Sequence, residues 1–217
     1  MLNNNEYLNK LYQSDQPLII YKTNNGFDVY TDFSKKYLIN RDNIKNFLNI
    51  QTKRKQSNIK SLNCYIGFFG YKVLCENIGI KMPKQKTNNF YEGIFYKPST
   101  KVKIRKNISI KSIKKNYRQI KTNKKNYSIL NKKFDLNLSL KKYSKLFDDF
   151  SKNIKQGKTY QIKIAQTYSK KGNVNAVELF WKLMKMNESP ESFLIRDKNY
   201  SIISCSPETL ILKKKNL

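Results

Sequence analysis

The chain has 217 residues, with 44 Lys and Arg against 15 Asp and Glu, so its formal net charge is +29, and it contains no histidine. The absence of histidine excludes Ser-His-Asp and Cys-His catalysis and zinc sites with histidine ligands. Proton transfer near neutral pH would need a carboxylate, lysine, tyrosine or cysteine with a shifted pKa. The length suffices for one substantial core or two small ones, so one or two domains fit.

Much of the positive charge has a simple explanation. Lys, Asn and Ile are abundant and Ala is rare, as expected for a gene rich in A and T. Cys64, Cys75 and Cys205 are too far apart in sequence for a CxxC pair, which predicts reduced thiols. The N-terminus lacks a signal-peptide pattern, and the chain lacks the run of about 18 apolar residues that a membrane span needs. We therefore expect a cytoplasmic protein that does not bind a membrane.

The first 50 residues predict a β-hairpin and a short helix. Residues 17–21 and 27–30 flank a turn at 24–26, a pattern typical of paired strands. The helix is expected over 42–48. The polar stretch 51–60 predicts an exposed loop.

The apolar segment 64–76 is punctuated by glycines. Gly67 and Gly70 either adopt unusual backbone angles or allow another segment to approach closely, because glycine has no Cβ. The aromatic residues of 90–96 predict a strand. Lysine dominates 101–133, which predicts a linker.

The last third of the chain has the clearest patterns. Apolar residues recur every three or four positions over 139–156, which predicts an amphipathic helix ended by Gly157. Alternation over 159–168 predicts a strand. A capping-box pattern at Asn175 and Glu178 opens a second helix. Further along, the chain predicts a hairpin made by 193–195 and 200–203, and a last strand over 209–212.

Several short motifs occur in a fixed order along these elements. They are Gly-Phe-Phe-Gly-Tyr at 67–71, Gly157–Gln166, Asn187–Pro190 and Ser206–Glu208. This order resembles the chorismate-binding enzyme family, which includes component I of anthranilate synthase and of aminodeoxychorismate synthase, and the isochorismate and salicylate synthases. The resemblance covers about residues 60–100 and 140–217.

The resemblance implies an α+β fold, a layered β/α sandwich of the anthranilate synthase component I type, with the C-terminal half missing. It assigns 1–100 to the N-terminal region, 101–136 to a basic linker and 137–217 to the beginning of the chorismate-binding domain. We expect the catalytic residues and the Mg²⁺ ligands of the family to lie beyond Leu217, with no metal ligand in this chain. The chain alone is therefore predicted to be inactive.

The resemblance also suggests substrate-binding residues. The family position of Gln161 faces the substrate and is Gln in enzymes that add ammonia to chorismate, but Lys in those that add water. Lysine can act there as a general base for water, whereas ammonia carries its own lone pair. Gln161 thus favours amination, with Mg²⁺ as cofactor and a glutamine amidotransferase subunit as the source of ammonia. Ser206 and Glu208 are further candidates, with a simple turn after a strand as the alternative.

The loop Asn187, Ser189 and Pro190 is a candidate regulatory or substrate-side loop. In some members of the family the equivalent loop helps to bind a regulatory tryptophan. The alternative is an ordinary helix end followed by a loop. Glu191 stands where an aromatic residue is common, which argues against a tryptophan pocket.

Four functions remain open. The residues around Gln161 and the lack of a tryptophan-regulation element near 18–21 favour 4-amino-4-deoxychorismate synthase component I, on the route to p-aminobenzoate and folate. The alternative is anthranilate synthase component I, of the tryptophan pathway. A basic nucleic-acid-binding protein, with Tyr117 and Tyr127 stacking on bases, is an alternative of another class, although no RNP, KH or zinc signature supports specific recognition. A non-catalytic subunit that binds an amidotransferase or a complementary half-domain is the fourth.

Overall fold

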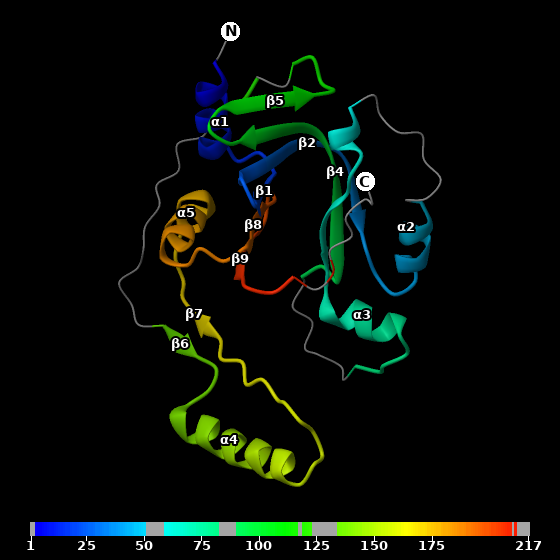
Figure 1. Ribbon diagram of the computed structural model, residues 1–217, viewed down its shortest axis with the longest axis vertical. Helices are drawn as coiled ribbons and strands as arrows, with labels where there is room; N and C mark the ends of the chain where they lie inside the picture. The colour runs from blue at the N-terminus through cyan, green and yellow to red at the C-terminus, as the bar shows by residue number, and fades with distance from the viewer. Residues whose placement is uncertain are drawn as a thin grey trace. The chain divides into compact units, whose positions relative to one another are not determined.

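The computed structural model describes residues 3–50, 59–82, 90–116, 119–122, 134–209 and 211. The chain forms two compact units, Met1–Lys124 with Ala176–Leu217, and Lys125–Asn175. Its helices are α1 (Asn4–Gln13), α2 (Ile44–Ile50), the 3₁₀ turn η1 (Lys60–Leu62), α3 (Tyr71–Asn77), α4 (Leu140–Lys155) and α5 (Ala176–Met186). Its strands are β1 (Leu18–Thr23), β2 (Gly26–Leu38), β3 (Ile66–Phe69), β4 (Gly93–Ile104), β5 (Ile108–Ser112), β6 (Asp135–Leu136), β7 (Tyr168–Ser169), β8 (Glu191–Arg196) and β9 (Ser201–Ser206). The predicted α+β class is confirmed (Figure 1).

One antiparallel sheet organises the first unit. Its strand order is β3-β4-β2-β1-β8-β9, with β5 paired to β4, and it curls into a half-barrel (Figure 1). The predicted hairpins β1–β2 and β8–β9 are both formed. Strand β1 also pairs with β8, so that Leu18 lies opposite Arg196. This pairing joins the beginning of the chain to its last part.

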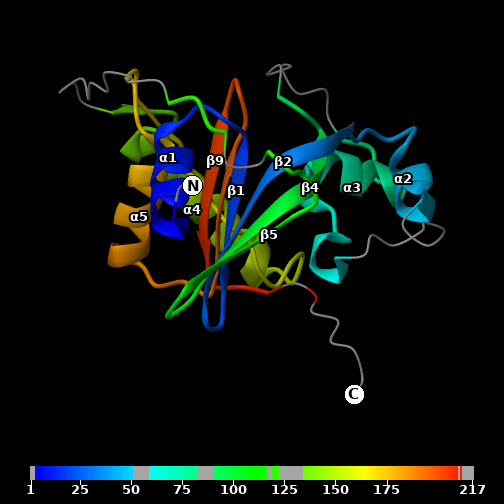
Figure 2. The ribbon, with the colours of Figure 1, turned by 90° about the horizontal axis from the view of Figure 1, so that it is seen from above.

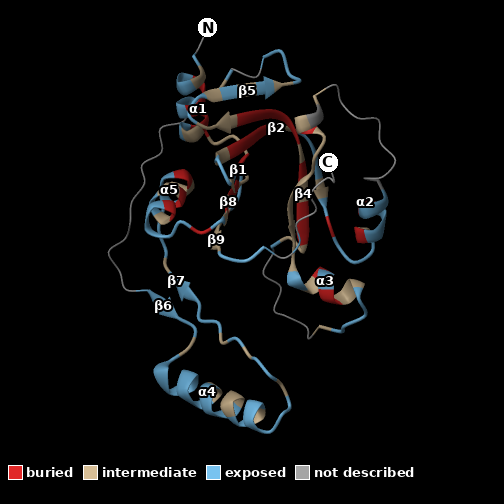
Figure 3. Cartoon of the chain, in the orientation of Figure 1, coloured by how far each residue is buried: buried red, intermediate tan, exposed pale blue. Residues whose placement is uncertain are grey.

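Helices α1 and α5 pack on one face of this sheet (Figure 2). Side chains alternate between the two faces of a strand, so Leu18 and Ile20 of β1 meet the helices, while Ile19 points to the opposite face. Figure 3 shows the buried residues of both helices on the side that faces the sheet. Eight side chains of this core are fully buried: Tyr7, Leu11, Leu18, Ile20, Val29, Val102, Phe180 and Leu194.

A second cluster lies on the opposite face of the sheet, and a third lies beside α2 and α3. The second cluster contains Ile19, Tyr30, Ile94, Tyr96 and Ile195. The third contains Ile39, Ile44, Phe47 and Val73. Helix α2 confirms the helix predicted over 42–48.

The two glycines of the 64–76 segment are required by close backbone approach. A Cβ at Gly67 would lie 1.8 Å from the carbonyl oxygen of Ile94, and one at Gly70 would lie 2.4 Å from that of Glu92. Neither glycine has a positive φ. Of the two alternatives drawn from the sequence, close approach is therefore confirmed.

Part of the predicted basic linker is strand. β4 continues to Ile104, and β5 follows over Ile108–Ser112. Ile104, Ile108 and Ile110 pack against the core beneath α1 and α5, so these isoleucines mark a half-buried hairpin rather than a solvated chain. Tyr117, Tyr127 and residues 51–58 of the loop predicted over 51–60 lie outside the described residues. The domain boundaries of the sequence stay predictions.

The second unit contains α4 and the short ladder β6–β7. The amphipathic helix predicted over 139–156 is confirmed: Ser139 caps its N-terminus by accepting a hydrogen bond from the backbone N–H of Lys142. Gly157 follows its end with φ +70°, a conformation suited to glycine.

Two predicted strands differ. The prediction of a strand over 159–168 is wrong except at Tyr168. In this segment of the described chain, strand pairing begins only at Tyr168 and Ser169, which pair with β6. An alternating sequence makes a strand only where another strand supplies hydrogen bonds. Thr209 and Ile211, from the predicted last strand, lie outside any strand, and residues 210 and 212 are not described.

Candidate functional site

A cavity of about 410 Å³ lies in the first unit, lined by β1, β3, β8 and the end of β9. Its apolar wall is formed by Ile19, Ile66, Phe193 and Ile195. Its polar groups belong to Tyr21, Glu191, Ser204, Ser206 and Glu208. The pairing of β1 with β8 creates this grouping, because it sets residues 19–21 beside 193–195.

Two of the predicted substrate-binding residues, Ser206 and Glu208, line this cavity together. Ser206 is the last residue of β9, and Ser204 points to the same side because side chains repeat every second residue of a strand. The Ser206 hydroxyl accepts a hydrogen bond of 3.3 Å from the backbone N–H of Glu208. This contact is the simple turn that the sequence left as an alternative, and it leaves both side chains at the cavity.

Glu191 accepts two hydrogen bonds on the polar side of the cavity. One carboxylate oxygen accepts a hydrogen bond of 2.9 Å from the Tyr21 hydroxyl, and the other accepts one of 2.5 Å from the Thr209 hydroxyl. The bond from Thr209, followed by that from Tyr21, holds the pKa of Glu191 below its usual value against the opposing effect of burial. Burial, helped by the bond to Glu191, raises the pKa of Tyr21 to about 12. At neutral pH the site therefore pairs an ionised carboxylate with a protonated phenol.

The loop Asn187–Pro190 connects α5 to β8 and is held by its own polar groups. The Ser189 hydroxyl donates to the Asn187 side-chain oxygen at 2.8 Å, and the Ser192 hydroxyl donates to the Ser189 carbonyl at 2.8 Å. The Glu188 carbonyl accepts a bond of 2.8 Å from the Lys22 ammonium. These contacts are those of a helix end and loop; a regulatory role for the loop stays a prediction.

Gln161 belongs to the other compact unit. Its side chain is exposed, in a segment without regular secondary structure, and its carbonyl accepts a bond of 3.1 Å from the Thr159 hydroxyl. The substrate-facing role suggested for Gln161 stays a prediction.

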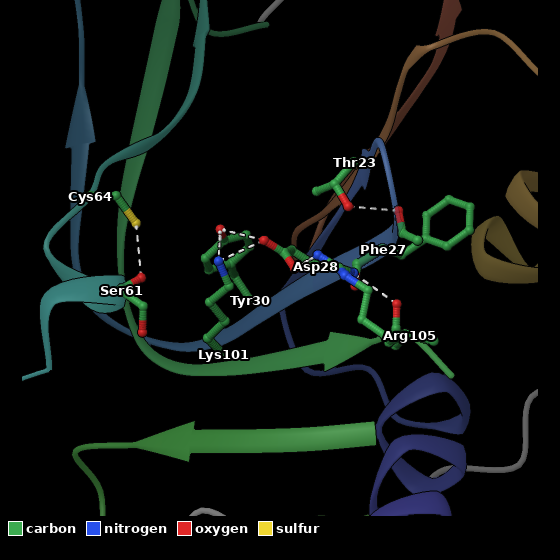
Figure 4. Close-up of polar contacts among 10 residues, drawn as sticks. Thr23, Phe27, Asp28, Tyr30, Ser61, Cys64, Lys101 and Arg105 are labelled. Atoms are coloured by element: carbon green, nitrogen blue, oxygen red, sulfur yellow. Dashed lines mark hydrogen bonds and ion pairs between the residues drawn. The ribbon is translucent and has the colours of Figure 1, made fainter. Parts of the chain in front are cut away.

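Sequence reasoning missed a cluster of charges buried against the sheet (Figure 4). Asp28 pairs with the Lys101 ammonium at 2.6 Å and with the Arg105 guanidinium at 2.8 Å. The Lys101 ammonium also donates to the Tyr30 hydroxyl at 2.8 Å. Burial would lower the pKa of Lys101, but the bonds to Asp28 and Tyr30 outweigh it and raise that pKa. Lys101 therefore stays charged and holds β2 to β4 rather than acting as a base.

Cys64 lies near this cluster (Figure 4), and burial raises the pKa of its thiol. Its sulfur lies 4.0 Å from the Ser61 carbonyl oxygen. A thiol that stays protonated is a weak nucleophile and a poor metal ligand. Cys64, Cys75 and Cys205 are all free, in agreement with the reduced thiols expected from the sequence.

The comparison with protein families decides the family. The family model described as "chorismate binding enzyme" matches residues 7–217. The chain belongs to the chorismate-binding enzyme family. Anthranilate synthase component 1 of Haloferax volcanii is 36% identical to it over 59 residues, which are 27% of this chain and 11% of that relative. The chain therefore matches only a small part of this relative's length.

The charge of the cavity differs from what a dicarboxylate ligand such as chorismate requires. Chorismate carries two carboxylates, which proteins bind with Arg, Lys or backbone N–H groups. The described lining offers Glu191 and Glu208 but neither Lys nor Arg. With these lining residues, the cavity suits a neutral or cationic group better than a carboxylate.

The described residues of this member of the chorismate-binding enzyme family show no cluster of metal ligands. They contain no group of three or more His, Cys, Asp or Glu side chains that could hold a metal ion. Likewise, no helix in the described part of the chain has the length and apolar character needed to cross a membrane.

Proposed function

We propose that the protein acts in the addition of ammonia to chorismate, as a component I of the 4-amino-4-deoxychorismate synthase type. Membership of the chorismate-binding enzyme family supports the substrate. Gln161 supports ammonia over water as the nucleophile, because a neutral amide can orient a nucleophile but cannot take its proton. A glutamine amidotransferase subunit as the ammonia source and Mg²⁺ as the cofactor belong to the same proposal.

Anthranilate synthase component I is the alternative, and one observation favours it. The Haloferax volcanii relative that matches 59 residues of this chain carries that name. The two activities share chorismate and ammonia and differ in the product, so the product distinguishes them.

Growth of two bacterial strains tests the proposal. The complete open reading frame that contains these 217 codons is expressed, with a glutamine amidotransferase, in a strain that requires p-aminobenzoate and in one that requires tryptophan. The proposal expects growth without p-aminobenzoate only. Growth without tryptophan only would establish the alternative, and growth of neither strain would overturn both.

A substitution at Gln161 tests the role of that residue. In extracts of the complemented strain, Gln161→Lys is expected to lower ammonia-dependent product formation at least tenfold, because lysine introduces a positive charge when protonated, and a base when neutral, where the amide stood. Gln156→Lys is the matched control, since Gln156 is exposed at the end of α4. Equal activity of the two variants would remove Gln161 from the substrate site.

A further inference from the structure

Five side chains form a polar and aromatic cluster within the first unit, here called the clasp. Lys36 of β2 and Tyr96 of β4 lie opposite each other in the sheet, and Tyr91 lies just before β4. Asp197 and Tyr200 belong to the turn between β8 and β9. The clasp thus joins β2 and β4 to a hairpin that is not their neighbour in the sheet, because β1 lies between β2 and β8.

The Asp197 carboxylate accepts three hydrogen bonds. One oxygen accepts bonds from the Lys36 ammonium and from the Tyr96 hydroxyl, each at 2.6 Å, and the other accepts one of 2.7 Å from the backbone N–H of Lys198. The hydroxyls of Tyr96 and Tyr200 lie 2.7 Å apart. The Asp197 side chain is only 8% exposed, so these donors replace the water that a carboxylate otherwise needs.

Aromatic rings complete the clasp. The Lys36 ammonium lies 5.1 Å from the centre of the Tyr91 ring and 5.7 Å from that of the Tyr96 ring, within the range of cation–π attraction. The rings of Tyr91 and Tyr200 are 5.7 Å apart. Both elements that the clasp joins therefore contribute to the surroundings of one ion pair.

The clasp lies where backbone pairing to the hairpin ends. The ladder between β1 and β8 ends at Leu18, which lies opposite Arg196, and β1 begins at that residue. Strand β2 continues past Thr31, the residue opposite Leu18 on the other side. The turn also extends past this point, closed by a bond of 2.9 Å from the Asp197 N–H to the Tyr200 carbonyl. Side chains of the clasp therefore span the gap that β1 spans along the rest of the sheet.

Different groups hold the two faces of the hairpin. On one face, Leu194 packs in the core with α1 and α5, and the Arg196 guanidinium donates to carbonyl groups at the end of α1. On the opposite face, Tyr96 and Tyr200 of the clasp pack in the second cluster. The four residues that form the apolar wall of the cavity belong to the same cluster. Loss of the clasp therefore acts on the face that carries the cavity.

We propose that the clasp is a latch on the half-barrel. When its bonds break, the turn between β8 and β9 moves away from β2 and β4, and the second cluster and the cavity wall open to solvent. The contacts of Leu194 and Arg196 keep the hairpin on α1 and α5, so the opening is local and needs less free energy than global unfolding. The latch acts on the cavity whatever ligand the cavity takes, so it goes beyond the proposed function.

Native-state hydrogen exchange, measured by mass spectrometry at pH 7 in low concentrations of urea, tests the latch in the 217-residue chain. Amides of the β8–β9 hairpin should exchange faster than those of α5. Their exchange should also depend less on urea, because urea dependence scales with the surface that an opening exposes. Asp197→Asn should speed hairpin exchange about tenfold or more while its urea dependence stays weak, as for a lost hydrogen bond to a charged group.

Matched variants and a native thiol complete the test. Lys36→Met should act like Asp197→Asn, and the double variant should add little, because both changes remove one interaction. Asp42→Asn and Lys35→Met, at exposed positions outside the clasp, should leave hairpin exchange unchanged. Cys64 packs against the second cluster, so its labelling by N-ethylmaleimide should accelerate by a factor similar to that of hairpin exchange.

Three results would overturn the proposal. The first is equal urea dependence for the hairpin and α5, which would mean that the hairpin opens only by global unfolding. The second is hairpin exchange that neither Asp197→Asn nor Lys36→Met accelerates. The third is faster exchange in the turn with unchanged labelling of Cys64, which would mean that the face carrying the cavity stays closed.

Discussion

Replacing Gly67 by alanine is expected to detach strand β3 from the sheet. The added Cβ would lie 1.8 Å from the Ile94 carbonyl oxygen and 2.7 Å from the Cα of Phe95, whereas such contacts normally exceed about 3.3 Å. Both neighbours are backbone atoms of β4, so no side-chain rotation relieves the clash. Loss of the β3–β4 pairing removes a few backbone hydrogen bonds, each worth about 1 kcal/mol. We expect a loss of about 3 kcal/mol in the free energy of unfolding, a large share of a typical total of about 5 to 15 kcal/mol.

Urea unfolding, followed by circular dichroism and by the fluorescence of the single tryptophan, measures this loss. Gly79→Ala is the control, because a Cβ there meets no atom within 4 Å but the residue has φ +85°. It should cost only about 1 to 2 kcal/mol, the usual penalty of a left-handed conformation. If Gly67→Ala is within 0.5 kcal/mol of the wild type, or is milder than Gly79→Ala, the argument from close backbone approach is refuted.

Three other predictions concern the core, a charge pair and activity. Phe180→Ala removes a fully buried ring of α5 and should lower the free energy of unfolding by about 3 to 5 kcal/mol, measured by thermal or urea unfolding. Burial alone would raise the pKa of Asp197, but hydrogen bonds from Lys36 and Tyr96 hold it below the usual 3.8. The stability that Asp197 contributes is therefore complete above about pH 4 and is lost as the pH falls through the lowered pKa. Urea titrations between pH 7 and pH 2 should show Asp197→Asn less stable than the wild type at neutral pH and equal to it at the acid end. The purified 217-residue chain, given chorismate, ammonium and Mg²⁺, should form no product above the blank in a chromatographic assay.

Local patterns were enough to predict the elements that depend on neighbouring residues. The β1–β2 hairpin follows from a turn between two apolar segments, and α4 and α5 follow from helical spacing. Close approach at Gly67 was one of two alternatives that its residue type left open, and the sequence did not identify the strand that approaches it. For the hairpin and the two helices, the signal and the structure lie within one continuous segment.

Features that depend on distant pairing were not predictable in this way. The alternation of 159–168 is indistinguishable from that of a true strand, and only the partner strand decides. The sequence does not distinguish Lys101 from the many other lysines of the chain. Its burial beside Asp28 results from the pairing of β4 with β2.

The cavity is another consequence of distant pairing. Ser206 and Glu208 were proposed as a site from a motif, but Tyr21 and Glu191 join them only because β1 pairs with β8. No local sequence pattern predicts which residues of β1 and β8 lie opposite each other, because most of the chain separates the two strands.

The product made from chorismate tests the central claim most directly. Extracts of cells that express the complete open reading frame containing this chain, with and without an amidotransferase subunit, are given chorismate, Mg²⁺ and either glutamine or ammonium, and the products are separated by chromatography. The account predicts 4-amino-4-deoxychorismate, detected as p-aminobenzoate after addition of the lyase that converts it, with Gln161→Lys suppressing its formation. Isochorismate as the sole product, independent of any nitrogen source, would contradict the amination account.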